Sequence, residues 1–349
     1  MTVRTAPRWF VATMIGALTA ALLAACGAQR DAPSTADPQG VAASTGATAV
    51  SGEQEGPWAF TDDRGVEVSL ESRPRRVVAY ETAASALWYL GIDPVGIFAV
   101  SPLAENPQLS GVDLSGIEPV GEVYGEINME RLAALRPDLI VTAFDPGEPE
   151  VASGFADVGQ QEQAQAIAPI VAIDGTKSPT VVIGRFEELA EALGADLNTP
   201  ELAAARDRFD EAVEELRAAV ASKPGLRALA IGAYDQLYFA KPAAFPALRQ
   251  YQQWGLDLVE PGGDNRFWDI VSFELADKYP ADLILYDNRP VSLSLGDLAK
   301  IPTWRTLPAV EAGQLVGWEG HENWSFQLYA EDIELIAEAV KRADPDIVP

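Results

Sequence analysis

An internal repeat constrains the fold of this chain more than any other feature of its sequence. The segment NMERLAALRPDLIV, residues 128–141, recurs in pattern as SFELADKYPADLIL, residues 272–285, which begins 144 positions later. Each copy opens with a residue that can cap a helix, Asn128 or Ser272, and continues as a short amphipathic helix. A proline then ends the helix, and Asp-Leu-Ile begins an apolar run typical of a buried parallel strand. We therefore expect two similar α/β lobes.

The sequence around the two copies shows the same alternation of strands and helices. In the first lobe we predict strands over 76–80, 95–100 and 170–173, and a helix over 82–90 that Gly91 ends. In the second lobe we predict strands over 227–233, 283–286 and 314–318, and a closing helix over 326–342. Such alternation favours parallel sheets with helical crossovers.

A long helix is predicted between the lobes. Residues 198–201, NTPE, combine a capping residue, a proline at an early helical position and a glutamate three places after Asn198. Apolar residues then recur every three or four positions, at Leu202, Ala205, Phe209, Val213, Leu216 and Val220. About 22 helical residues span roughly 33 Å at 1.5 Å per residue, so this helix would restrict hinge motion.

The predicted fold class is therefore α/β, with two similar lobes of mainly parallel sheet, a rigid connecting helix and a ligand cleft between the lobes. We place the N-terminal lobe at 58–195, the connecting helix at 196–223 and the C-terminal lobe at 224–349.

The first residues of the chain predict export and lipid anchoring. A basic start is followed by residues 9–25, which carry no charge, the arrangement of a secretory signal peptide over 1–25. The residues LAAC that end at Cys26 resemble the bacterial lipobox, which implies cleavage before Cys26 and attachment of diacylglycerol and fatty acid (palmitate) to it. The alternative is an ordinary signal peptide with an incidental cysteine. Residues 26–57 are small and polar and predict a flexible linker with a reach of roughly 30 Å.

Composition excludes several classes of protein. The formal net charge of −27 repels nucleic acid and anionic headgroups, so we expect no nucleic-acid partner and membrane contact through the lipid alone. Cys26 is the single cysteine, which rules out a disulfide framework. His321 is the single histidine, which argues against a histidine-based metal site and a Ser-His-Asp triad.

Several motifs in this order carry a family resemblance. They are PRRVV at 74–78, LGIDPVG at 90–96, NMERL and RPDLI within 128–140, and SFE and ADLI within 272–284. With the lipobox before them, they resemble the substrate-binding lipoproteins of ABC importers for iron–siderophore complexes and vitamin B12, over about residues 58–345.

This resemblance implies a function. The chain would be a monomeric, lipid-anchored receptor on the extracytoplasmic face of the cell membrane, without catalytic residues or a cofactor. It would capture a ferric siderophore complex and deliver it to an ABC permease and, through the permease, to the ATPase subunits.

The resemblance also assigns a role to two glutamates. In the family, one glutamate on each lobe docks into arginines of the permease, and the matching positions here are Glu130 and Glu274. The alternative is that both are first-turn acids that favour the helix dipole, worth about 0.3–1 kcal/mol. Both statements can hold together, because an exposed carboxylate near a helix start pairs readily with arginine.

A ligand between the lobes would lie beyond the carboxyl ends of the strands. Aromatic faces with a few polar groups suit a bulky metal chelate, and arginines suit its chelating oxygens. The candidates that follow predicted strands or cluster with tryptophans are Tyr80, Tyr124, Tyr234, Tyr238, Arg266, Trp268, Arg289, Trp318 and Trp324. The alternative for each aromatic residue is a place in the core. We expect His321 at the surface or the cleft rim, without a metal role.

Three other functions remain open from the sequence. In the first, the chain is a receptor of the same kind whose ligand is cobalamin or haem. A lipid-anchored hydrolase is a rival from another class, although no nucleophile–base pair is recognisable. A structural or adhesive surface lipoprotein is the third, and it predicts no saturable small ligand.

Overall fold

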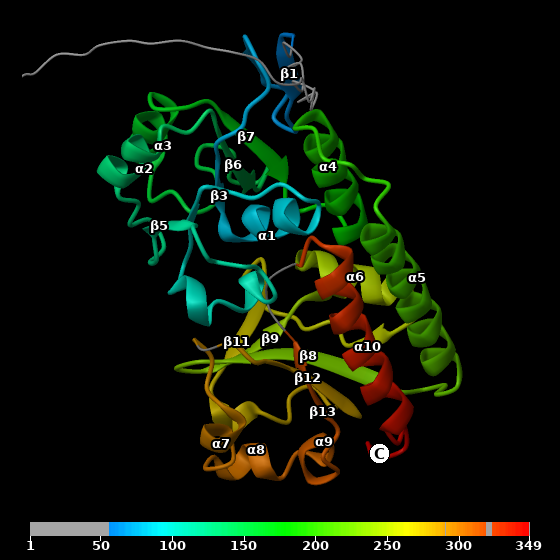
Figure 1. Cartoon of the computed structure of the whole chain (residues 1–349). Helices are drawn as coiled ribbons and strands as arrows, with labels where there is room; N and C mark the ends of the chain where they lie inside the picture. The colour runs from blue at the N-terminus through cyan, green and yellow to red at the C-terminus, as the bar shows by residue number, and fades with distance from the viewer. Residues whose placement is uncertain (1–55, 290, 319–322, 349) are drawn as a thin grey trace, which may run out of the picture. The chain divides into compact units, whose positions relative to one another are not determined.

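The computed structural model describes residues 56–289, 291–318 and 323–348. Cys26, the predicted signal peptide, nearly all of the predicted linker and His321 lie outside these residues. The described residues form two α/β lobes, each built around one sheet, with a long helix beside them (Figure 1). This arrangement confirms the predicted fold class. No helix among the described residues is both long enough and apolar enough to cross a bilayer.

The N-terminal sheet is entirely parallel, in the order β5-β4-β3-β6-β7. Its strands are β3 (Val77–Tyr80), β4 (Gly96–Phe98), β5 (Glu118–Gly121), β6 (Leu139–Phe144) and β7 (Ile170–Asp174). Alternate residues of each strand enter two cores, because successive side chains of a strand point to opposite faces. One face packs against α1 (Glu81–Tyr89) and α4 (Pro179–Ala192), and the other against α2 (Met129–Leu135) and α3 (Val158–Gln165).

A small antiparallel hairpin precedes this sheet. It consists of β1 (Trp58–Thr61) and β2 (Glu67–Leu70). The Trp58 indole donates a hydrogen bond of 2.8 Å to the carbonyl of Ala192 at the end of α4. The hairpin is thereby fixed to the N-terminal lobe.

The C-terminal sheet is mixed, in the order β11-β9-β8-β12-β13. Its strands are β8 (Arg227–Ala233), β9 (Leu237–Ala240), β11 (Trp268–Val271), β12 (Leu283–Asp287) and β13 (Leu315–Trp318), with the short β10 (Asp257–Leu258) beside β8. The three strands β8, β12 and β13 are parallel, whereas β9 and β11 are antiparallel to their neighbours.

Helices cover both faces of this sheet. The helices α6 (Pro246–Gln253) and α10 (Phe326–Arg342) pack on one face, and the short helices α8 (Pro302–Arg305) and α9 (Pro308–Glu311) on the other, with α7 (Leu295–Leu298) nearby.

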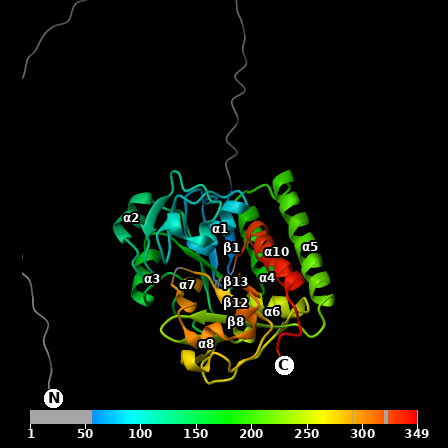
Figure 2. The same cartoon turned by 90° about the horizontal axis from the view of Figure 1, so that it is seen from below.

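The connecting helix α5 (Pro200–Ala221) has 22 residues, as the sequence predicts. It lies alongside α10 in both views (Figures 1 and 2). Phe209 of α5 is buried against the rings of Phe326 and Tyr329, at centroid distances of 5.6 and 5.8 Å. The capping residue within 198–201 is Thr199, whose hydroxyl accepts from the backbone N–H of Leu202, so the cap lies one residue later than the spacing of Asn198 and Glu201 indicates.

The two copies of the repeat differ more than the sequence predicts. In the first copy, Asn128 caps α2 by accepting from the N–H of Arg131 at 2.9 Å. In the second, the predicted amphipathic helix is only a 3-10 turn, η4 (Phe273–Leu275), and Ser272 makes no capping hydrogen bond. After this turn, Lys278 and Tyr279 both bond to Asp269 of β11, at 2.6 and 2.8 Å, and hold the chain against the sheet.

Candidate ligand-binding cleft

A cavity of about 540 Å³ lies between the two lobes. On the N-terminal side it begins where β3, β6 and β7 end, which is the position expected for a ligand in a parallel α/β sheet. On the C-terminal side its wall is formed by the start of α6, by the segment before β11 and by Trp324, two residues before α10. The lining residues that carry the argument below are Tyr80, Thr82, Tyr124, Asp145, Thr176, Phe245, Arg249, Arg266, Phe267 and Trp324.

Four of the nine predicted ligand residues line this cavity: Tyr80, Tyr124, Arg266 and Trp324. Tyr80 is buried at the end of β3, and Tyr124 is 57 % exposed in the loop after β5. Their roles in binding a ligand stay predictions, but their positions are those that a ligand contact needs.

The other five candidates lie away from the cavity wall. Tyr234 packs edge-on against Tyr238 at 4.9 Å, and Tyr238 against Trp268 at 5.9 Å, so these three form an aromatic row on the C-terminal sheet. Trp318 is 5 % exposed and packs against Trp268 and Phe245, and its place is in the core.

Arg289 is committed to a partner in its own lobe. Its guanidinium bonds to both carboxylate oxygens of the buried Asp287, at 2.8 and 2.7 Å. The hydroxyl of Tyr234 donates to the same carboxylate at 2.6 Å. Burial, then the hydrogen bond to Asp287, raises the pKa of Tyr234 to about 12. This group is a structural network within the C-terminal lobe, and the guanidinium of Arg289 is committed to it.

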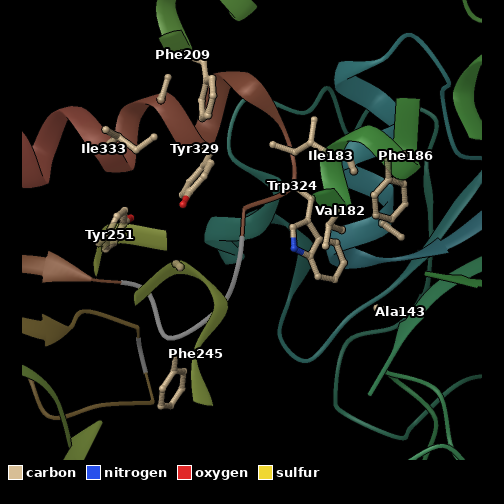
Figure 3. Close-up of a cluster of buried hydrophobic side chains, with 14 of the residues drawn as sticks. Ala143, Val182, Ile183, Phe186, Phe209, Phe245, Tyr251, Trp324, Tyr329 and Ile333 are labelled. Atoms are coloured by element: carbon tan, nitrogen blue, oxygen red, sulfur yellow. The ribbon is translucent and has the colours of Figure 1, made fainter. Parts of the chain in front are cut away.

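Trp324 lines the cavity and joins the two lobes. Trp324 belongs to the segment that leads into α10 in the C-terminal lobe. Its ring stacks on Phe186 of α4 in the N-terminal lobe, with a centroid distance of 5.6 Å (Figure 3). Gly175, after β7, permits this approach, because an added Cβ there would lie 3.1 Å from the indole. The indole N–H has no hydrogen-bond partner among the described residues. Trp324 is therefore both core and cavity wall.

Polar contacts cross the cleft between the lobes. The guanidinium of Arg266 forms an ion pair with Asp145, which follows β6, at 3.0 Å. Arg249 of α6 donates to the carbonyl of Thr176 at 2.6 Å and to that of Ala243, in its own lobe, at 2.8 Å. These contacts tie together the walls on either side of the cavity.

A buried carboxyl group lies between two lining residues, Tyr80 and Thr82. Glu81 is fully buried, and its Oε2 accepts from the N–H of Val100 at 2.9 Å and from the amide of Asn106 at 2.6 Å. Burial raises the pKa of Glu81, although these hydrogen bonds oppose the effect. Burial and the neighbouring Glu81 also hold the pKa of Tyr80 well above its usual value, so Tyr80 stays a neutral phenol.

The raised pKa of Glu81 predicts a pH dependence of stability. The pKa of Glu81 is higher in the folded state than in the unfolded state, where it is about 4.3. Protonation of this carboxyl therefore stabilises the fold fully below the unfolded pKa, and the stabilisation is lost as pH rises through the folded-state pKa. The variant Glu81→Gln lacks this titration. We therefore expect the free energy of unfolding of Glu81→Gln, minus that of the parent chain, to increase from pH 4 towards neutrality.

Urea unfolding at several pH values measures this difference. The exposed Glu211 on α5 offers the control Glu211→Gln, for which the difference should stay nearly flat. A difference for Glu81→Gln that is constant or falls with pH would contradict the assignment.

Several lining residues escaped the sequence analysis. Thr82 and Thr176 come two residues after β3 and β7 end, so the rule that ligands meet strand ends was sufficient to find them. Phe245 and Arg249 lie at the start of α6, a helix that the sequence analysis did not predict. Phe267 directly follows the predicted Arg266.

The two glutamates predicted to dock are both exposed. Glu130 lies in the first turn of α2 and Glu274 in η4, as acids of the first turn. Neither takes part in an ion pair within the described part of the chain. Their carboxylates are thus available to a partner, and the docking role stays a prediction.

Metal-binding side chains do not gather in the described residues. No group of three or more His, Cys, Asp or Glu side chains there is placed to hold a metal ion.

Comparisons with known proteins agree with this geometry. A family model described as periplasmic binding protein matches residues 77–321. A direct comparison with curated proteins finds no match.

Solved structures include a ferric-siderophore receptor protein, DesE from Streptomyces coelicolor, at 31 % identity and a TM-score of 0.77, over 82 % of this chain and 99 % of that chain. The siderophore periplasmic binding protein from the fuscachelin gene cluster of Thermobifida fusca is 27 % identical, with a TM-score of 0.57, over 77 % and 97 % of the two chains. The triscatecholate siderophore binding protein FeuA from Bacillus subtilis, solved with ferri-bacillibactin, shares the fold at 15 % identity, with a TM-score of 0.62 over 81 % and 98 %. With the family match and the identity to DesE, this chain belongs to the periplasmic binding protein family.

Proposed function

We propose that this chain is the solute-binding receptor of an ABC importer and captures a ferric siderophore complex in the cleft between its lobes. The observation that carries the proposal is the cavity of about 540 Å³ at the strand ends, walled by aromatic and hydroxyl-bearing side chains. The likeness of this chain to a ferric-siderophore receptor, over 82 % of its length, supports the class of ligand. The chain breaks no bond in this function; it binds the complex reversibly and releases it to a permease.

Binding and release would involve small movements of the lobes. The Arg266–Asp145 ion pair and the Arg249–Thr176 hydrogen bond cross the cavity and must part when the cleft opens. The helix α5 and its packing against α10 resist a wide hinge motion. Delivery then depends on a permease that recognises both lobes at once, for which we propose Glu130 and Glu274 as contacts.

The test is a titration of tryptophan fluorescence in the full chain, purified in detergent. The panel contains ferric hydroxamate and catecholate chelates, their iron-free forms, cobalamin and haem. Because chelates absorb light, each titration is paired with free tryptophan. We expect saturable quenching by one ferric class. Quenching by cobalamin or haem alone would identify that compound as the ligand in place of a ferric siderophore. The absence of saturable binding to every compound of the panel would refute the receptor function.

We further propose that Cys26 carries a lipid that holds the receptor at the extracytoplasmic face of the cell membrane. The lipobox-like LAAC and the polar linker after it support this proposal. Radiolabelled palmitate should be incorporated into the parent chain and not into Cys26→Ser. Mass spectrometry of the mature N-terminus should find a modified Cys26. Palmitate in the Cys26→Ser variant, or an unmodified cysteine in the parent chain, would show that the anchor is elsewhere or absent.

A further inference from the structure

We propose that the cleft selects a ferric chelate without net negative charge, of the trihydroxamate class, over a triscatecholate complex. This inference rests on the proposed function and adds the chemical class of the ligand. It is argued from the charges that line the cavity.

The two classes of chelate differ most in charge. Three hydroxamate groups carry one negative charge each and cancel the charge of Fe(III). Three catecholate groups carry two each, so their ferric complex is a trianion. A site for the trianion must supply several cations, because moving a charged ligand into a partly enclosed cleft removes its hydration.

The cavity offers little positive charge that is free for a ligand. Among the described residues that line it, Arg249 and Arg266 are the cations and Asp145 is an acid. Arg266 is neutralised by Asp145 at 3.0 Å, and its guanidinium also lies 4.8 Å from the centre of the Phe267 ring. Two nitrogens of Arg249 are occupied by backbone carbonyl oxygens at 2.6 and 2.8 Å. Whether or not these contacts part when the cleft opens, the described lining carries two positive charges and one negative charge, and a net charge near one positive unit is too little to balance a trianion.

The remaining polar groups of the wall are neutral. Among the described residues they are hydroxyl groups, from Tyr80, Tyr124, Ser153 and Thr176, while the hydroxyl of Thr82 and the indole N–H of Trp324 are buried behind the wall. Such groups solvate the uncharged oxygens of a neutral complex, and the aromatic rings accept its apolar chain. Beyond the cleft, the formal net charge of −27 slows the approach of an anion rather than a neutral molecule.

The experiment compares a linear ferric trihydroxamate with a ferric triscatecholate on the full chain in detergent, by calorimetric titration at low and high salt. We expect the trihydroxamate to bind at least about a hundredfold more tightly, with an affinity that salt hardly changes. Equal or tighter binding of the triscatecholate would overturn the charge inference and leave the receptor function intact. Binding of neither chelate would refute the proposed function itself, together with this inference.

A single substitution tests the cause of the selectivity. Asp145→Asn removes the acid that neutralises Arg266, and asparagine retains an acceptor for the N–H of Gly147, which Asp145 holds at 2.6 Å. We expect the variant to bind the triscatecholate about tenfold more tightly than the parent does, with the gain lost at high salt.

The control is Asp210→Asn, which changes the overall charge equally on the exposed face of α5, away from the cavity. It should leave both affinities unchanged. No gain for the triscatecholate in Asp145→Asn, or an equal gain in Asp210→Asn, would show that the cavity charge does not set the preference.

Discussion

Reversing the charge of both Glu130 and Glu274 is expected to abolish uptake of the ferric siderophore while ligand binding continues. Each carboxylate is exposed in the first turn of its element and is free of ion pairs within the described residues. A lysine at either place would face the arginines expected on the permease, and like charges at an interface oppose docking. We expect each single reversal to reduce uptake about tenfold and the double reversal to reduce it to background.

Controls for this prediction must separate docking from the loss of a helix-dipole contact. Glu201 and Glu311 are also exposed acids in first turns, of α5 and α9. Their reversal costs a similar amount of helix stability, about 0.3–1 kcal/mol, so Glu201→Lys and Glu311→Lys should leave uptake near the parent value. Normal uptake by the double variant at Glu130 and Glu274, with ligand affinity intact, would show that the permease reads other residues.

The strands that could be predicted from the sequence are those in which every residue is buried. The strands β3, β6 and β7 are buried along their whole length, so they read as unbroken apolar runs in the sequence. In contrast, β9 contains one half-buried residue, and β11 alternates between buried residues and residues that are half-buried or exposed. The helix α4 also escaped, since its first residues, TVVI at 180–183, are β-branched and have low helix propensity.

The candidate site was predictable as an edge of the sheet, but not as a set of side chains. The end of a strand places Tyr80 and Tyr234 at comparable positions, in β3 and after β8. Tyr80 lines the cavity, whereas Tyr234 turns to the buried carboxylate of Asp287. Nothing local in the sequence indicates that Asp287 is buried and bonded to both Tyr234 and Arg289. The direction of a side chain at a strand end therefore depends on distant partners.

Replacing Phe209 with alanine is expected to lower the free energy of unfolding by about 3–5 kcal/mol. Phe209 is 7 % exposed in the middle of α5, and its ring contacts Trp254, Phe326 and Tyr329. Truncation removes the buried ring and leaves a cavity among side chains that rest on opposing helices. Chemical unfolding followed by circular dichroism measures the change. The exposed Glu211 on the same helix provides the control Glu211→Ala, which should stay within about 0.5 kcal/mol of the parent.

The same variant tests whether the lobes unfold together. The helix α10 packs along α5, and Trp324, just before α10, stacks on Phe186 in the N-terminal lobe. A defect at Phe209 thus reaches both lobes through one continuous cluster of buried hydrophobic side chains, to which Phe186, Trp324 and Tyr329 also belong. We expect the parent and Phe209→Ala to unfold in a single transition, shifted to lower denaturant in the variant, with tryptophan fluorescence and circular dichroism coincident. Two separate transitions, of which only one moves, would mean that each lobe is stable alone, and that α5 connects the lobes without coupling their stability.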